Sequence, residues 1–216
     1  EILKRVSGPN VYLLIDDLDA TFQNTDSECL SLSTFFSACR YLAQDVSGIC
    51  FRVTMRSDVW PTIRRYDESL DKLEQYVTEL NWSAEEFRTL LYKRIESQSK
   101  ENSFDLPSRQ YNESNEIYEL RILKMLFVEK IEWGSKNVLS FKVIHTLSYE
   151  RPRWAIQLCK LAQESAVRKR KSVISKDEID SVWGDYGAKR IADLVAERKH
   201  QCKQIEELIT AFRGAD

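Results

Sequence analysis

The sequence lacks most of the residue patterns that assign a protein to a well-known chemical class. Its five cysteines are far apart and include no C-x-x-C pair, so they predict neither a zinc site nor a disulfide framework, and they fit a reducing, cytoplasmic location. The two histidines, His145 and His200, stand alone, and no Ser-His-Asp or Cys-His arrangement follows from them. No apolar run is long enough to cross a bilayer, so no membrane partner is expected.

Charge of one sign is not in excess either. The 216 residues include 32 Lys and Arg against 34 Asp and Glu, for a net charge of -2. So close a balance makes no overall electrostatic case for a nucleic-acid partner, and the run Arg168–Lys171 is a local exception of the kind that is usually a solvated helix end. With 43% apolar residues the chain can bury a sizeable core, which predicts one or two domains.

The first third of the sequence has the pattern of a strand, a helix and a second strand. Residues 11–15 form a continuous apolar run, which is typical of a strand buried on both faces of a parallel sheet. Thr25 and Glu28 have the spacing of a capping box and predict a helix start. Residues 49–54 predict the second strand. The short connections favour a βαβ unit with a right-handed crossover.

The remaining sequence has mainly helical patterns. Ser83 and Glu86 form a second capping box, and the polar residues 97–114 predict a loop. Helical patterns follow over residues 115–131, 139–148, 152–169 and 175–212. The predicted fold class is therefore α/β followed by all-α, with a partial parallel sheet in a domain of residues 1–80 and a helical lid and further helices in a domain of residues 81–216.

An acidic segment directly follows the first predicted strand. Asp16, Asp17 and Asp19 are three acids in four positions. Open α/β sheets bind ligands at the carboxyl ends of their strands. There, one carboxylate suits Mg²⁺, usually through water, and its neighbour suits the orientation of an attacking water. The alternative is that these acids only cap the following turn, since Asp is a common turn residue.

Arg56 follows the second predicted strand, at the same edge of the sheet as the acids. Its planar guanidinium suits a terminal phosphate, because it donates paired hydrogen bonds. The alternative is an arginine that neutralises the acids or extends to solvent. For Arg56 taken alone, this plainer interpretation is favoured.

Two arginines flank a proline at the predicted start of the helix over residues 152–169. Pro152 suits the first helical position, so Arg151 and Arg153 lie at the positive end of the helix dipole, where cations are mildly disfavoured. This conflict indicates a bound anion, such as a phosphate, held by the arginines and the helix N-terminus together. The alternative is that Glu150 pairs with one arginine and solvent screens the other.

In their order along the chain, these segments resemble P-loop NTPases of the AAA+/STAND (KAP-like) type. The strand ending in Asp16-Asp17-Leu18-Asp19 resembles a Walker B motif, Thr54-Met55-Arg56 resembles a sensor-1 arginine, and residues 150–153 are similar to a sensor-2 region. Residues 80–87 resemble the entry into a helical lid. The resemblance covers roughly residues 8–165 and implies a P-loop NTPase sheet that binds ATP and Mg²⁺.

The resemblance also implies roles for the residues that match. Asp16 would associate with Mg²⁺ and Asp17 would be the catalytic acid that positions water, with Asp19 beside the cofactor. Arg56 would contact the γ-phosphate from the sheet. Phosphate would be contacted from the lid by one of two residues, Arg151 or Arg153. Candidate arginine fingers toward an oligomeric neighbour are Arg64, Arg65 and Arg94.

Two departures from the family pattern limit this interpretation. Ala20 stands where KAP-type proteins often have arginine, and no G-x-x-x-x-G-K-[ST] occurs in the sequence. Because that loop precedes Walker B, we expect the sequence to be the C-terminal portion of a longer protein. Without the backbone cradle and the lysine of the loop, weak ATP binding and negligible hydrolysis are expected of these residues alone.

The expected function is that of a nucleotide-binding regulatory ATPase. ATP binding or hydrolysis would drive a conformational or assembly switch, with self-association or a protein partner as its readout, and the resemblance suggests bacterial defence or signalling as the setting. The alternative is a non-catalytic protein. It would be a helical scaffold, or a nucleic-acid-binding module that uses Arg168–Lys171 and Lys189-Arg190.

Overall fold

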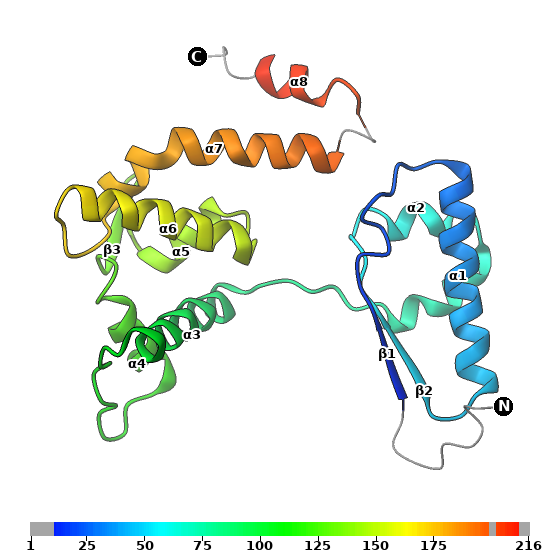
Figure 1. The fold of residues 1–216 in the computed structure, drawn as a ribbon, viewed down its shortest axis with the longest axis horizontal. Helices are drawn as coiled ribbons and strands as arrows, with labels where there is room; N and C mark the ends of the chain where they lie inside the picture. Colours follow the sequence, from blue (N-terminus) through cyan, green and yellow to red (C-terminus); the bar gives the residue numbers. More distant parts are fainter. Residues whose placement is uncertain (1–10, 199–201, 212–216) are drawn as a thin grey trace. The chain divides into compact units, whose positions relative to one another are not determined.

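The computed structural model describes residues 11–198 and 202–211, which form two compact units (Figure 1). The first unit comprises the residues up to Glu79 together with those from Val195 onward, and the second comprises Leu80–Leu194. The sequence predicted a division at residues 80 and 81 and placed all later residues in the helical domain. His200 lies outside the described residues.

In the first unit, two parallel strands are joined by a long helix. Strand β1 (Val11–Ile15) pairs with β2 (Ile49–Val53) from Val11↔Ile49 to Ile15↔Val53, and α1 (Asp26–Asp45) connects them. The predicted capping box at the start of α1 is confirmed, because the Thr25 side chain accepts from the Glu28 N–H while the Glu28 carboxylate accepts from the Thr25 N–H. The predicted strand, helix and strand are therefore present.

The helices that follow β2 complete the core of the first unit. They are α2 (Trp60–Arg64) and the 3-10 helix η2 (Glu68–Tyr76), and α8 (Ile205–Ala211) also belongs to this unit. The buried apolar side chains come from the turn after β1, from α1, and from the segment that contains α2 and η2: Phe22, Cys29, Leu32, Val59, Ile63 and Leu70. None of these side chains comes from β1 or β2, so helices and turns rather than a sheet supply the apolar contacts of this core.

The predicted partial parallel P-loop NTPase sheet is wrong. Within the described ranges, β1 and β2 form a sheet of only two strands, the other sheet is a two-stranded antiparallel hairpin, and helices predominate. The apolar run of β1 predicted burial on both faces, but Tyr12 is 56% and Leu14 is 78% exposed. Such a run indicates that a strand is suited to burial, but it does not determine how many strands join it.

The second unit is helical apart from one hairpin. Its elements are α3 (Ala84–Asn102), α4 (Asn115–Leu123), β3 (Lys130–Trp133), β4 (Lys136–Leu139), α5 (Ser140–Leu147), α6 (Pro152–Arg168) and most of α7 (Lys176–Arg198). Buried side chains from these elements share one core, which includes Phe87, Ile122, Ile144, Leu158 and Tyr186. His145 is part of this packing, since its Nε2 lies 2.9 Å from the Trp82 carbonyl oxygen.

The hairpin corrects the helix that was predicted over residues 115–131. Helix α4 ends at Leu123, and β3 and β4 then pair with Ile131 opposite Val138. Gly134 makes the turn with a φ of 60°, which a glycine adopts without steric cost. Among the helices of residues 11–198 and 202–211, none combines the length and the apolar character needed to span a membrane.

Candidate functional site

The carboxyl ends of β1 and β2 bring Asp16 and Thr54 together. Ile15 and Val53 are the last paired residues, so the next residue of each strand lies at the same edge. There the Thr54 hydroxyl donates a hydrogen bond to the Asp16 carboxylate. This bond, and a second from the Asp17 backbone N–H, hold the pKa of Asp16 below its ordinary value. Asp16 is therefore an exposed, ionised carboxylate whose orientation is set by its neighbour.

Asp17 occupies a turn that leaves it exposed. Its φ is 58°, in the left-handed region that Asp tolerates better than most residues, and its carbonyl oxygen accepts a hydrogen bond from the Ala20 N–H at 3.1 Å. The turn therefore places a second carboxylate beside Asp16 at the solvent-facing edge.

Asp19 differs from the two preceding acids, because it is buried and paired. Its side chain accepts from the Arg56 backbone N–H at 2.9 Å and from Arg56 Nε at 3.2 Å, and the residue is only 6% exposed. These bonds tie the turn after β1 to the turn after β2. Arg56 therefore neutralises one of the acids, Asp19, which is the plainer of the two interpretations of this arginine.

Arg56 is held on several sides. Its Nη1 donates to the Glu197 carbonyl oxygen at 3.4 Å, and its Nε lies 3.8 Å from Asp58, which pairs with Arg198 at 2.7 Å. In the part of the chain that the structure describes, Arg56 Nη2 is buried with no hydrogen-bond partner. A buried guanidinium nitrogen without an acceptor is unfavourable, so this edge has one donor that an anionic oxygen would satisfy.

A single carboxylate at this edge is compatible with Mg²⁺. Within the described residues, no group of three or more His, Cys, Asp or Glu side chains is arranged to hold a metal ion. Mg²⁺ commonly keeps several waters and takes only one or two protein carboxylates, together with phosphate oxygens of a substrate. Asp16 fits such a site, since it is ionised, exposed and oriented by Thr54.

The two predicted lid arginines lie in the second unit and differ from each other. Helix α6 begins at Pro152, as predicted, with Arg151 as its N-cap residue and no side-chain hydrogen bond to the cap. The Arg151 guanidinium lies over the Trp154 ring, 4.5 Å from its centroid, whereas Arg153 is exposed. The first unit thus holds Asp16 and Arg56, and the second holds Arg151 and Arg153.

Of the three candidate arginine fingers, one is occupied within its own unit. Arg64 pairs with Asp71 at 3.1 Å and with Glu74 at 2.7 Å. Arg65 and Arg94 are exposed. The choice among the three fingers therefore narrows to these two.

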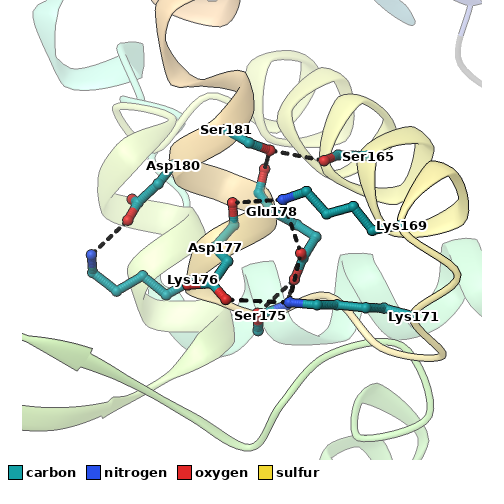
Figure 2. Close-up of polar contacts among 9 residues, drawn as sticks. All are labelled: Ser165, Lys169, Lys171, Ser175, Lys176, Asp177, Glu178, Asp180 and Ser181. Atoms are coloured by element: carbon teal, nitrogen blue, oxygen red, sulfur yellow. Dashed lines mark hydrogen bonds and ion pairs between the residues drawn. The ribbon is translucent and has the colours of Figure 1, made fainter.

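Half of the basic run considered for nucleic-acid binding is paired with acids. Lys169 and Lys171 lie 3.2 Å and 2.9 Å from the Glu178 carboxylate, and Lys171 also pairs with Asp177 (Figure 2). Glu178 is fully buried. Burial alone raises the pKa of this carboxyl, but hydrogen bonds from Ser175 and the two lysines outweigh it and hold the pKa at about 2. The two lysines therefore join α6 to α7 instead of forming an open basic patch.

Sequence reasoning gave no specific role to two residues that the fold positions at these arginines. Trp154 belongs to no motif in the sequence, yet the guanidinium groups of Arg151 and Arg190 both lie on its ring. Arg190 was considered only as part of a basic pair for nucleic acid, but its side chain is 11% exposed. No local motif marks either residue, because their contact joins the start of α6 to a position 36 residues later on α7.

The fold defines a mainly helical protein with a small parallel strand pair in a separate unit. Residues 85–195 match the model of the FunZ-associated C-terminal helical domain, and this span is just over half of the 216 residues. The chain belongs to this family. Neither a curated protein nor a solved structure matches it.

Proposed function

We propose that the protein binds a nucleotide with Mg²⁺ at the carboxyl edge of β1 and β2 and uses the occupancy of this site as a regulatory switch. The observation that supports the proposal is the pairing of Thr54 with Asp16, which keeps an exposed carboxylate ionised beside Asp17. The resemblance of these motifs to the AAA+/STAND type favours ATP as the nucleotide. The cytoplasmic location remains a prediction that fits this role.

The residues at this edge suggest a division of labour. Asp16 would hold Mg²⁺, which when bound offsets the negative charge of the phosphates. Thr54 keeps Asp16 oriented. The Asp19 carboxylate anchors Arg56 by accepting hydrogen bonds from the backbone N–H and the Nε of Arg56. Arg56 Nη2 remains as a donor for a terminal phosphate oxygen. Asp17 would orient a water against the terminal phosphorus and accept its proton as the bond from that phosphorus to the leaving nucleoside diphosphate breaks.

The absence of the phosphate loop from the 216 residues sets the scale of the expected activity. Backbone N–H groups and a lysine usually supply most of the phosphate contacts in such sites. The edge of β1 and β2 offers a metal-binding carboxylate and one guanidinium instead. For this chain, we therefore propose weak, metal-dependent nucleotide binding, with turnover close to the uncatalysed rate.

Binding of Mn²⁺–ATP, followed by electron paramagnetic resonance of Mn²⁺, tests the proposal. Asp16→Asn should weaken binding about tenfold, because it removes the charged metal contact. Asp45→Asn is the matched control, since Asp45 is an exposed acid of the same unit at the end of α1. Equal affinities for the wild type, Asp16→Asn and Asp17→Asn would refute the proposed site.

A non-catalytic helical scaffold is the second candidate. It is favoured by the position of the family match, which covers residues 85–195, nearly all of them in the helical unit, and leaves out β1 and β2. Its nucleic-acid version is less supported, since Lys169 and Lys171 pair with Glu178. Replacing Arg168–Lys171 with serine tests that version. Salt-dependent DNA binding that is lost in this variant would favour it over the nucleotide switch.

A further inference from the structure

The last turn of α7 lies against the turn that follows β2. The residues from Val195 onward belong to the first unit, together with β1 and β2. Arg198 pairs with Asp58 at 2.7 Å, and the Glu197 carbonyl oxygen accepts a hydrogen bond from Arg56 Nη1 at 3.4 Å. The side chains of Arg198 and Asp58 are 26% and 18% exposed, so their ion pair is partly shielded from water. The end of α7 is therefore fastened at two neighbouring points, one of which is Arg56.

Arg56 suits the end of α7 for an electrostatic reason. The last four carbonyl groups of a helix have no partner within the helix and carry the negative end of its dipole. Glu197 is the next-to-last residue of α7, so its carbonyl group is one of these. The Arg56 guanidinium thus meets the negative end of α7 in the way that it would meet a phosphate oxygen. The helix end and a phosphate therefore compete for the same cation.

The side-chain donors of Arg56 are not open to a ligand in this arrangement. Nε donates to Asp19 and Nη1 donates to Glu197, while Nη2, which has no hydrogen-bond partner among the described residues, is buried. A phosphate oxygen can reach Nη2 only when a neighbouring segment moves. Asp19 holds Arg56 through two hydrogen bonds, at 2.9 Å and 3.2 Å, whereas the contact with Glu197 is single and longer. Of these two neighbours, the end of α7 is the more weakly held by Arg56.

We propose that the last turn of α7, residues 195–198, is an autoinhibitory latch on Arg56. The ion pair of Arg198 and Asp58 fastens it. In the closed latch the Glu197 carbonyl group takes the place of a phosphate oxygen, and in the open latch Nη1 and Nη2 of Arg56 are free to donate to the terminal phosphate. A phosphate is repelled by the negative end of α7, so the nucleotide and the closed latch exclude each other.

This inference rests on the proposed function for the identity of the ligand, and it supplies the regulation of that same site. Because only the open latch binds the nucleotide, the apparent affinity falls with the fraction of molecules in which the latch is open. Binding in turn shifts the population toward the open latch. Occupancy of the strand edge is thereby converted into release of the end of α7.

Arg198→Met tests the latch, because charge alone and latch opening predict opposite results. Loss of one positive charge should weaken the binding of a nucleotide, whereas an open latch should strengthen it. By electron paramagnetic resonance of Mn²⁺, we expect Arg198→Met to bind Mn²⁺–ATP about fivefold more tightly than the wild type, the factor that loss of one partly exposed ion pair predicts. Lys72→Met is the matched control, since it removes an exposed positive charge from the same unit. It should not tighten binding.

Asp58→Asn breaks the same ion pair from the other side. It should also tighten binding, and the double variant with Arg198→Met should bind no more tightly than the tighter single variant, because both substitutions open one latch. Additive gains would show two independent charge effects and would overturn the latch. Circular dichroism confirms that each variant is folded. Should Arg198→Met not fold, Arg198→Lys decides, because it keeps the charge, loses the planar donor set and should still bind more tightly than the wild type.

Hydrogen exchange of the last turn of α7 reports on the latch without any nucleotide. Its amides should exchange about fivefold faster in Arg198→Met than in the wild type, since exchange and affinity both follow the open fraction, whereas those of α1 should be unchanged. Unchanged exchange in the last turn, or weaker Mn²⁺–ATP binding by Arg198→Met, would overturn the proposal. Failure of the proposed function is a different result. Faster exchange together with equal Mn²⁺–ATP affinities of the wild type and Asp16→Asn would refute the metal site and support only the fastening of α7 by Arg198.

Discussion

Thr54 donates its hydroxyl hydrogen to the Asp16 carboxylate across the carboxyl ends of two paired strands. This contact joins two residues 38 positions apart and turns a pair of strand ends into an oriented acidic edge. It also makes the two residues energetically dependent on each other, because the hydrogen bond favours the ionised form of Asp16.

Thr54→Val should raise the pKa of Asp16. The pKa lies below its ordinary value of 3.8, and the Thr54 hydroxyl is the largest cause. A lowered folded-state pKa stabilises the fold above the unfolded-state pKa, and the contribution is lost as pH falls through the folded-state value. Carbon-13 NMR titration of the carboxyl group measures the shift. Thr54→Ser is the control, and a pKa of Asp16 that is unchanged in Thr54→Val would contradict this assignment.

The buried ion pair of Arg88 and Glu119 should be important for the stability of the second unit. Arg88 Nε lies 2.8 Å from the Glu119 carboxylate, both side chains are less than 10% exposed, and the Thr89 hydroxyl lies 3.1 Å from the same group. Glu119→Ala would leave a buried guanidinium poorly paired, and we expect it to lower the free energy of unfolding by about 3 kcal/mol.

Urea denaturation followed by circular dichroism measures this effect. Glu116→Ala is the matched control, because Glu116 contacts the same arginine at 3.2 Å but its side chain is 64% exposed. Its loss should cost about 0.5 kcal/mol. Similar costs for the two substitutions would show that burial of Glu119 is not what matters.

Glu178 should make the junction of α6 and α7 sensitive to acid. The folded state holds the pKa of this carboxyl at about 2, below its ordinary value of 4.5. Because the folded-state pKa is the lower one, the stabilisation is fully present above about pH 4.5 and is lost as pH falls toward about 2. Thermal unfolding over this pH range should therefore show a falling midpoint, and the fall should be smaller in Glu178→Gln than in the wild type.

At neutral pH, Glu178→Gln should itself destabilise the fold by about 2 kcal/mol, since two lysines lose a buried anionic partner. Asp180→Asn serves as the comparison, because Asp180 makes an exposed pair with Lys176 one helical turn away. If both variants unfold with the same pH dependence as the wild type, the junction of α6 and α7 does not depend on Glu178.

Features set by nearby residues were predictable from the sequence. The capping box of Thr25 and Glu28 and that of Ser83 and Glu86 are both present, because each depends only on residues three positions apart. Pro152 begins α6 for a similar reason, since its fixed φ suits the first helical position. Local hydrogen bonds and backbone preferences are enough to place these helix starts.

Features that depend on residues distant along the chain were not predictable from the sequence. The apolar run of β1 was compatible with a wide parallel sheet, but the structure pairs it with β2 alone among the described strands. The helix predicted over residues 115–131 runs into the first residues of β3, since a short apolar segment has no unambiguous period. The number and pairing of strands depend on which backbone groups find partners, and periodicity does not carry that information.

The amino-acid sequence by itself determined that acids follow one strand and an arginine follows the next at one sheet edge. Only the tertiary structure gave the acids different environments. Asp16 is exposed and accepts a hydrogen bond from the Thr54 hydroxyl, whereas Asp19 is buried against Arg56. It also brought Arg190 to the Trp154 ring on which Arg151 lies. Burial and charge pairing are properties of residues distant along the chain, so they are decided only when the elements pack.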